Sequence, residues 1–138
     1  MKFERLAQAL LATASVIIFA IGVSFGGNPA TWLPAVYDIP ISTTAGAQFA
    51  RSVMGFMIGV VALWITGIVW RGFRVPALVL LAFTMTGLVL GRVSSLIIDG
   101  TDVPLIFTLY LIAESLTAAS AIVMLIGLGA ERRREANA

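Results

Sequence analysis

Four stretches of this 138-residue chain are long, apolar and almost free of charge, and this pattern restricts the fold more than any other feature. They cover about residues 6–27, 49–70, 75–98 and 105–128. About 20 apolar residues are enough for an α-helix to cross the hydrocarbon core of a bilayer. The pattern therefore predicts an all-α fold: a four-transmembrane-helix bundle, up-down-up-down, forming a single domain over residues 1–138.

Composition excludes several functional classes. The chain is 59% hydrophobic and 12% charged, whereas soluble domains are about 45–50% apolar and about 25% charged. It contains no cysteine and no histidine, which removes disulfides, thiolate ligands and the commonest metal ligand and general base. The net charge of +2 comes from basic residues that form no stripe of the kind that binds nucleic acid. We expect no metal, no cofactor and no nucleic-acid partner.

The first apolar stretch has two interpretations. From Leu6 to Phe25, about 20 residues carry no charge, which is enough to span a membrane. A cleaved signal peptide would have a shorter apolar region of about 7–15 residues, followed by a small-x-small cleavage motif. Because this run is longer and no good A-x-A motif closes it, an uncleaved helix is the favoured interpretation.

Residues 28–48 form a polar and aromatic connection between the first two stretches. Trp32 and Tyr37 suit a membrane interface, where amphipathic rings collect. The segment is long for a structureless loop. Two interpretations stay open: a loop that lies on the bilayer surface, and a lid over a cavity between the helices.

Lysine and arginine residues mark the flanks that are expected to face the cytoplasm. They precede the first stretch, separate the second from the third and follow the fourth, at Lys2, Arg5, Arg71, Arg74, Arg132, Arg133 and Arg134. The first and third connections carry only the acidic residues Asp38, Asp99 and Asp102. This alternation predicts a multi-pass protein of the bacterial inner membrane with both termini in the cytoplasm.

Two charged residues interrupt the last two stretches. A charge at the bilayer centre costs about 2.5–3.5 kcal/mol on insertion scales, so it is normally kept only with a partner. At 1.5 Å per residue, Arg92 lies about 12 Å before the turn at Gly100, and Glu114 lies about 15 Å beyond Pro104. Since the short turn makes the two helices antiparallel neighbours, an Arg92–Glu114 ion pair is predicted.

Further polar residues are expected around this pair. Arg51 begins the second stretch near the surface where Asp99 ends the third, so these two are candidates for a second ion pair. Three hydroxyl residues share a helix face with Arg92 or Glu114, namely Ser95, Tyr110 and Thr117. Their hydroxyl groups are predicted to satisfy the remaining donors and acceptors of the Arg92–Glu114 pair.

Three roles are open for this polar cluster. It can be an ion-pair staple that fixes helix packing, an outward-facing pocket for a small ligand or lipid head group, or a proton or ion path. The path is the weakest of these, because acidic residues are absent from the cytoplasmic half of the stretches. Ser94 and Ser95 have no histidine or lysine partner and are interpreted as packing or hydrogen-bonding residues.

Glycines four residues apart occur at Gly55 and Gly59 in the second stretch and at Gly87 and Gly91 in the third. Small residues at this spacing share one helix face and let a neighbouring helix approach closely. These four glycines are predicted to be helix-packing positions.

Several short motifs of the last three stretches recur together in one known family: Arg51-Ser-Val-Met-Gly55 with the later Gly59, Gly91-Arg92-Val-Ser-Ser-Leu-Ile-Ile-Asp99-Gly100, Pro104 and Ala113-Glu114. On these residues the chain resembles a family of small bacterial four-helix membrane proteins grouped as domain of unknown function 4345. It covers about residues 45–128. The resemblance implies four helices and a membrane location, and no established activity. The chain is also a little similar to the four-helix sterol-isomerase-related and DoxX-like groups, in architecture only, and architecture does not carry function.

The sequence favours a non-catalytic integral membrane protein, either free or an accessory or structural subunit packed against partner helices of a larger complex. The expected partners are membrane lipids, and other membrane-protein subunits or a second copy of the chain. The alternative is a small-ligand or lipid-binding membrane protein, with an isomerase-like enzyme as one version, whose outward-facing polar pocket contains Arg92, Glu114 and Asp99. No nucleophile–base pair, metal-ligand set or phosphate loop is evident.

Overall fold

The structure is a computed structural model that describes residues 2–137. Those residues form the helices α1 (Lys2–Gly26), α2 (Pro29–Tyr37), α3 (Thr44–Val69), η1 (Arg71–Phe73), α4 (Arg74–Ile98) and α5 (Leu105–Ala136). Four of them, α1, α3, α4 and α5, are long and apolar enough to cross a membrane. The predicted all-α fold with four long apolar helices is confirmed.

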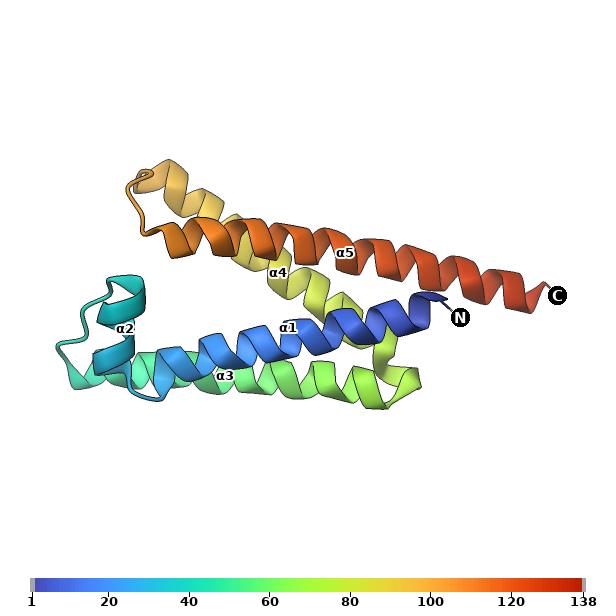
Figure 1. The fold of residues 1–138 in the computed structure, drawn as a ribbon, viewed down its shortest axis with the longest axis horizontal. Coiled ribbons are helices and arrows are strands. Elements are labelled where there is room, and N and C mark those ends of the chain that lie inside the picture. Colours follow the sequence, from blue (N-terminus) through green and yellow to red (C-terminus); the bar gives the residue numbers. More distant parts are fainter. Residues whose placement is uncertain (1, 138) are drawn as a thin grey trace.

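The four long helices run in alternating directions and form two pairs (Figure 1). α1 packs along α3, and α4 packs along α5. The turn at η1 joins the pairs, and toward the other end α4 and α5 diverge from α1 and α3 (Figure 1). The largest fully buried side chains come from all four long helices: Leu11, Trp64, Leu78, Leu81 and Leu128. The apolar core therefore holds the two pairs together.

Local sequence signals set where the helices begin. The side chain of Thr43 accepts a hydrogen bond from the Gly46 backbone N–H at 3.1 Å and so caps α3. Pro29 and Pro104 stand at the starts of α2 and α5, where the missing N–H of proline costs little. Gly100 adopts φ +100° in the turn after α4, a conformation that glycine tolerates best.

The segment between the first two predicted spans is not a loop throughout, because residues 29–37 form α2. Leu33 and Tyr37 are one helical turn apart, each 2% exposed, and they pack with Ala50 of α3. Trp32 points elsewhere and is 50% exposed. The expectation of a surface loop is wrong for these residues, since the spacing of Leu33 and Tyr37 gives the short helix one face to bury.

Two helix boundaries also differ from the predicted spans. α5 continues to Ala136, beyond the predicted end of the fourth stretch near residue 128, and includes the polar residues that follow that stretch. Alanine, glutamate and arginine are strong helix formers, so this polar segment continues the helix without an apolar face. α3 begins at Thr44, ahead of the predicted start near residue 49, because Thr43 supplies the cap.

The glycines that let helices approach within this chain are not the four that the spacing predicts. A Cβ added at Gly22 would lie 3.2 Å from Met57 Cβ, and one added at Gly26 would lie 2.5 Å from Met54 Cβ. By contrast, a Cβ added at any of the predicted positions would meet no described atom within 4 Å, namely Gly55, Gly59, Gly87 and Gly91. The predicted glycines therefore make no close helix contact inside residues 2–137, and packing against a second protein stays a prediction.

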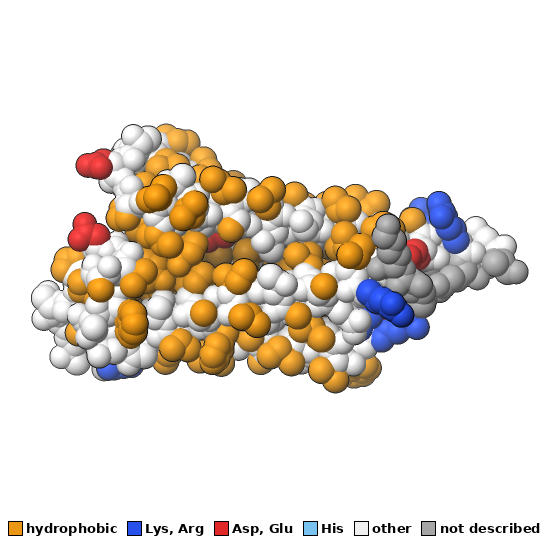
Figure 2. Space-filling view, viewed as in Figure 1, with side chains coloured by type: hydrophobic (Ala, Val, Ile, Leu, Met, Phe, Trp, Pro, Cys, Tyr) orange, Lys and Arg blue, Asp and Glu red, His pale blue; other side chains and the backbone are white. Residues whose placement is uncertain are grey.

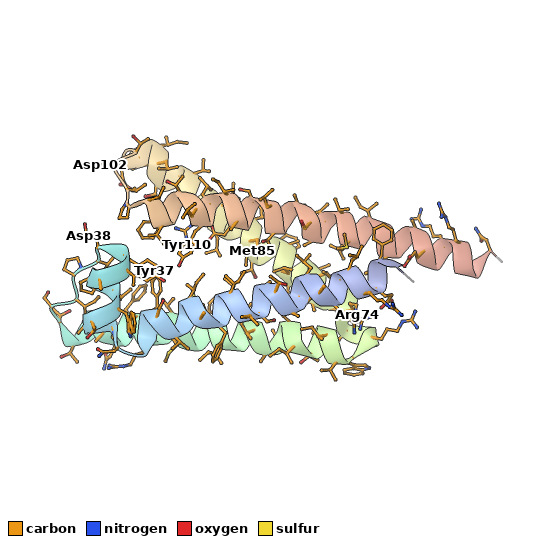
Figure 3. All side chains as sticks on the ribbon, in the orientation of Figure 1. Tyr37, Asp38, Arg74, Met85, Asp102 and Tyr110 are labelled. Carbon is orange, nitrogen blue, oxygen red and sulfur yellow. The ribbon has the colours of Figure 1, made fainter. Side chains whose placement is uncertain are left out.

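Charge is distributed unevenly along the bundle. Figure 2 shows apolar side chains over most of the visible face, most of the visible basic side chains at the end that carries the termini, and acidic side chains protruding from the opposite end. Arg74 lies at the first end, whereas Asp38 and Asp102 lie at the other (Figure 3). The side chains of Lys2 and Arg132, which belong to the predicted cytoplasmic flanks, lie outside the described part of the structure.

Candidate functional site

Arg92 of α4 and Glu114 of α5 bind each other directly. Arg92 Nε donates to Glu114 Oε2 at 2.7 Å, and Nη2 donates to Oε1 at 2.9 Å. Two parallel bonds between guanidinium and carboxylate are a strong and geometrically specific form of ion pair. The Glu114 side chain is 9% exposed and the Arg92 side chain 24%. This is the contact that the matched depths of the two residues predict.

Two aromatic rings of α5 pack against the guanidinium. Arg92 Cζ lies 5.3 Å from the ring centroids of both Phe107 and Tyr110, within cation–π range. Phe107 and Tyr110 precede Glu114 by seven and four residues, so all three share one face of α5. Phe107 is a site residue that the sequence reasoning missed, although its spacing from Glu114 carried the signal.

A chain of hydroxyl groups joins α5, α2 and α1 beside the ion pair. Tyr110 Oη lies 3.2 Å from Tyr37 Oη, which lies 2.8 Å from Ser24 Oγ. Because Ser24 Oγ donates its only proton to the Ile21 carbonyl at 2.7 Å, Tyr37 must donate to Ser24 and Tyr110 to Tyr37. The two tyrosine side chains point toward each other from α2 and α5 (Figure 3). This chain anchors α2 over the polar cluster.

The larger of two cavities at the ion pair, about 260 Å³, lies between α4 and α5. Its apolar lining comes from Leu96, Val103, Phe107 and Leu111. Its polar lining comes from Arg92, Ser95 and Thr108, and Gly91 leaves one wall without a side chain. The cavity is therefore mainly apolar, with three polar residues in its lining.

The smaller cavity, about 50 Å³, lies on the other side of the pair, between α1, α4 and α5. Glu114, Tyr110 and Met85 are among its lining residues. Figure 2 shows the surface hollowed between α1 and α5. The two members of the ion pair thus line different cavities, Arg92 the larger and Glu114 the smaller.

The predicted hydroxyl partners of the ion pair bond elsewhere. Ser95 Oγ donates to Asp99 Oδ2 at 2.7 Å, and Thr117 Oγ1 donates to the Ala113 carbonyl at 2.7 Å. The Tyr110 hydroxyl contacts Tyr37. The expectation that Ser95, Tyr110 and Thr117 satisfy the pair is therefore wrong. A nearer partner was available to each hydroxyl, one helical turn away for Ser95 and Thr117 and on α2 for Tyr110.

The predicted ion pair between Arg51 and Asp99 is absent from the described residues. Arg51 is exposed near the start of α3, and Asp99 accepts the bond from Ser95. The C-terminal end of α4 follows α5 away from the N-terminal end of α3 (Figure 1). The two residues belong to the same end of the bundle but to different helix pairs, which that divergence separates.

A second ionic cluster lies at the opposite end of the bundle and was not predicted. Glu4 of α1 accepts hydrogen bonds from Arg71 Nε at 3.2 Å and from Arg74 Nη1. Arg74 also donates to the carbonyls of Gly67 and Ile68 at the end of α3, both at 3.2 Å. The sequence signal was Glu4 itself, an acidic residue that stands between Lys2 and Arg5 in a basic flank. This cluster ties the start of α1 to the α3–α4 turn.

The Arg92 site can bind a hydrogen-bond acceptor. Nε and Nη2 are used by Glu114, whereas no hydrogen bond from Nη1 to another described residue is present. Within residues 2–137, no group of three or more metal-ligating side chains could hold a metal ion. The site thus offers fixed N–H donors on Arg92, a residue that lines a mainly apolar cavity.

Comparison with known proteins supplies a family but no activity. No curated protein and no solved structure matches the chain. A family model described as a domain of unknown function, DUF4345, matches residues 6–126, which is most of the sequence and includes both members of the ion pair. With its four long apolar helices, the chain therefore belongs to the DUF4345 family.

Proposed function

We propose that this protein is a non-catalytic integral membrane protein that binds an amphiphilic ligand, a lipid or lipid-like small molecule, in the cavity between α4 and α5. The observation that carries the proposal is the position of Arg92 in the lining of a mainly apolar cavity of about 260 Å³. Ligand sites are typically apolar clefts in which a few polar groups fix orientation. An ion pair that served packing alone would need no such cavity beside it.

The site faces the non-cytoplasmic half of the membrane in this proposal. Support comes from the basic side chains at the end that carries the termini and the acidic residues Asp38 and Asp102 at the other end (Figure 3). Cytoplasmic flanks carry an excess of Lys and Arg. Arg92 lies two helical turns from the acidic end of α4, so a ligand would enter from the outer leaflet.

The ion pair prepares the site as well as holding the helices. Glu114 fixes the guanidinium through two bonds, and the rings of Phe107 and Tyr110 restrict it further. An arginine held in place loses less side-chain entropy when a ligand binds. The pair thus serves both as a staple between α4 and α5 and as a preorganised donor.

Gly91 offers a direct test. It lines the cavity, and a Cβ added there would meet nothing within 4 Å, so Gly91→Leu should fill the cavity without disturbing the bundle. Gly87→Leu is the matched control, since Gly87 lies one turn earlier, has the same open surroundings and does not line that cavity. The measurement is the amount of lipid or small molecule that co-purifies from native membranes, quantified by mass spectrometry after extraction.

We expect Gly91→Leu to lower that amount by about tenfold or more, which corresponds to about 1.4 kcal/mol. Gly87→Leu should leave it unchanged. Equal yields from wild type and Gly91→Leu, with both variants folded, would reject the cavity as the binding site.

A second candidate function rests on a different surface. Gly55 and Gly59 of α3 are exposed with open space above them, and Phe56 between them is 69% exposed. Small residues four apart let a partner helix approach closely. In this alternative the chain is an accessory subunit that packs α3 against another membrane protein or a second copy. Gly59→Leu should then release a co-purifying protein or reduce the oligomer mass, while Gly87→Leu should not.

A further inference from the structure

We infer that the cavity beside Arg92 selects an uncharged amphiphile whose polar end is a hydrogen-bond acceptor, such as an ester or ketone carbonyl, over an anionic one. This inference rests on the proposed function and names the ligand class of the same site. It follows from the charge balance, the unused donors and the size of the cavity.

The first support for this inference is the net charge of the residues around the cavity. Arg92 is the only charged side chain among the described lining residues, and Glu114 already neutralises it at 2.7 and 2.9 Å. Asp99 adds a further negative charge at the edge of the site, through its bond from Ser95. An anionic head group would therefore make the site net negative in surroundings of low dielectric, where unpaired charge is costly. A neutral head group keeps the balance.

An anionic head group also cannot simply replace Glu114 as the partner of Arg92. The Glu114 side chain is 9% exposed, and a displaced carboxylate would stay buried without a cation. The cation–π contacts with Phe107 and Tyr110 hold the guanidinium where Glu114 meets it. The ligand must bind the existing ion pair rather than break it.

The N–H groups of Arg92 that Glu114 does not bind favour a head group that accepts hydrogen bonds. Arginine carries five N–H donors and no acceptor, and Glu114 takes one from Nε and one from Nη2. A carbonyl oxygen can accept from the remaining N–H groups, whereas a group that can only donate finds no acceptor on Arg92. The Thr108 hydroxyl, which also lines the cavity, is a further donor.

The volume of the cavity limits how much of the ligand it can enclose. A cavity of about 260 Å³ is close to the lower limit of about 300 Å³ for small-molecule sites. It can hold a head region and the first part of an apolar chain against Leu96, Val103 and Leu111. The rest of the chain would extend along the helices into the bilayer.

The test uses purified full-length protein in nonionic detergent and two competing probes with the same alkyl chain. Methyl heptadecanoate is uncharged and has a carbonyl acceptor, while hexadecane-1-sulfonate is a permanent anion. An equimolar mixture is equilibrated with the protein, and the bound fraction is extracted and quantified. We expect the ester to exceed the sulfonate by about tenfold in wild type, a ratio equivalent to about 1.4 kcal/mol.

A variant that removes one negative charge tests whether charge balance causes the preference for the ester. Glu114→Gln keeps the shape of the side chain and an oxygen acceptor for Arg92 but removes the negative charge, so the preference should move toward the sulfonate. Asp38→Asn also removes one negative charge, on an exposed residue outside the cavity, and should keep the wild-type ratio. A Glu114→Gln protein with the unchanged wild-type ratio would overturn the charge-balance explanation.

The remaining outcomes separate this inference from the proposed function. If wild type binds the sulfonate in preference, and Gly91→Leu abolishes that binding, the inference is wrong and the binding site stands. If neither probe binds saturably, or Gly91→Leu binds both as wild type does, the proposed function fails. The wild-type competition needs no variant, so it stays decisive even where Glu114→Gln is unstable.

Discussion

The side chains of Arg92 and Glu114 bind each other through two hydrogen bonds, yet they line two different cavities. Arg92 lines the space between α4 and α5, and Glu114 lines the narrow space that reaches α1. The ion pair thus stands between a cavity large enough for part of a ligand and one of about 50 Å³. Removing either member should therefore affect both stability and binding.

Breaking this pair from one side should cost more than removing it entirely. Arg92→Gln or Glu114→Gln leaves one buried charge unpaired, and each should lower the free energy of unfolding by about 1–3 kcal/mol. The double variant should recover part of that loss, because no charge is then stranded. Thermal unfolding in detergent measures all three. Ser115→Ala on the same helix removes only an exposed hydroxyl that bonds its own backbone, and serves as the control. Strictly additive losses would mean that the two residues do not interact.

The ionic cluster at Glu4 predicts an order of effects among its members. Arg74 is 5% exposed and also binds two carbonyls of α3, so Arg74→Gln should destabilise the protein by about 1–3 kcal/mol. The Arg71 side chain is 60% exposed, and Arg71→Gln should cost at most about 1 kcal/mol. Thermal unfolding of the two variants under the same conditions provides the comparison. The reverse order would contradict the assignment of Arg74 as the main partner of Glu4.

The hydroxyl chain predicts that Tyr37 matters more than Tyr110 for the position of α2. Tyr37→Phe removes two hydrogen bonds, whereas Tyr110→Phe removes one, and each bond contributes about 1 kcal/mol. Amide hydrogen exchange within Pro29–Tyr37 should rise most in Tyr37→Phe, less in Tyr110→Phe and not at all in Ser52→Ala, an exposed hydroxyl of α3 that bonds its own helix. Unchanged exchange in both tyrosine variants would show that apolar packing alone holds α2.

Topology can be read with single cysteines, because the chain contains none. Ser42→Cys and Asp102→Cys lie in the connections at the acidic end, and Arg133→Cys lies near the basic end of α5. With cytoplasmic termini, a membrane-impermeant maleimide should label the first two in right-side-out vesicles and the third only in inverted vesicles. Labelling of all three from one side would contradict four membrane-spanning helices.

The sequence alone was enough for the four long helices and for one contact. Each long helix follows from a run of about 20 or more apolar residues, a signal that depends only on local composition. The Arg92–Glu114 contact was also predictable, because the two residues lie at similar distances from a short turn that makes their helices antiparallel neighbours. Both inferences need only rise per residue and chain connectivity.

Tertiary structure decided what lies between helices that are distant in the sequence. The divergence of α4 and α5 from α1 and α3 separates the end of α4, which precedes Asp99, from the start of α3, which contains Arg51 (Figure 1). The position of α2 places Tyr37 beside Tyr110 of α5 (Figure 3). The same packing pairs Glu4 with Arg71 and Arg74 across about 70 residues of chain. The spacing of residues along one helix indicates which of them share a face. Which neighbour that face meets depends on how all the helices pack at once, and so the cavity beside Arg92 could not be read from the sequence.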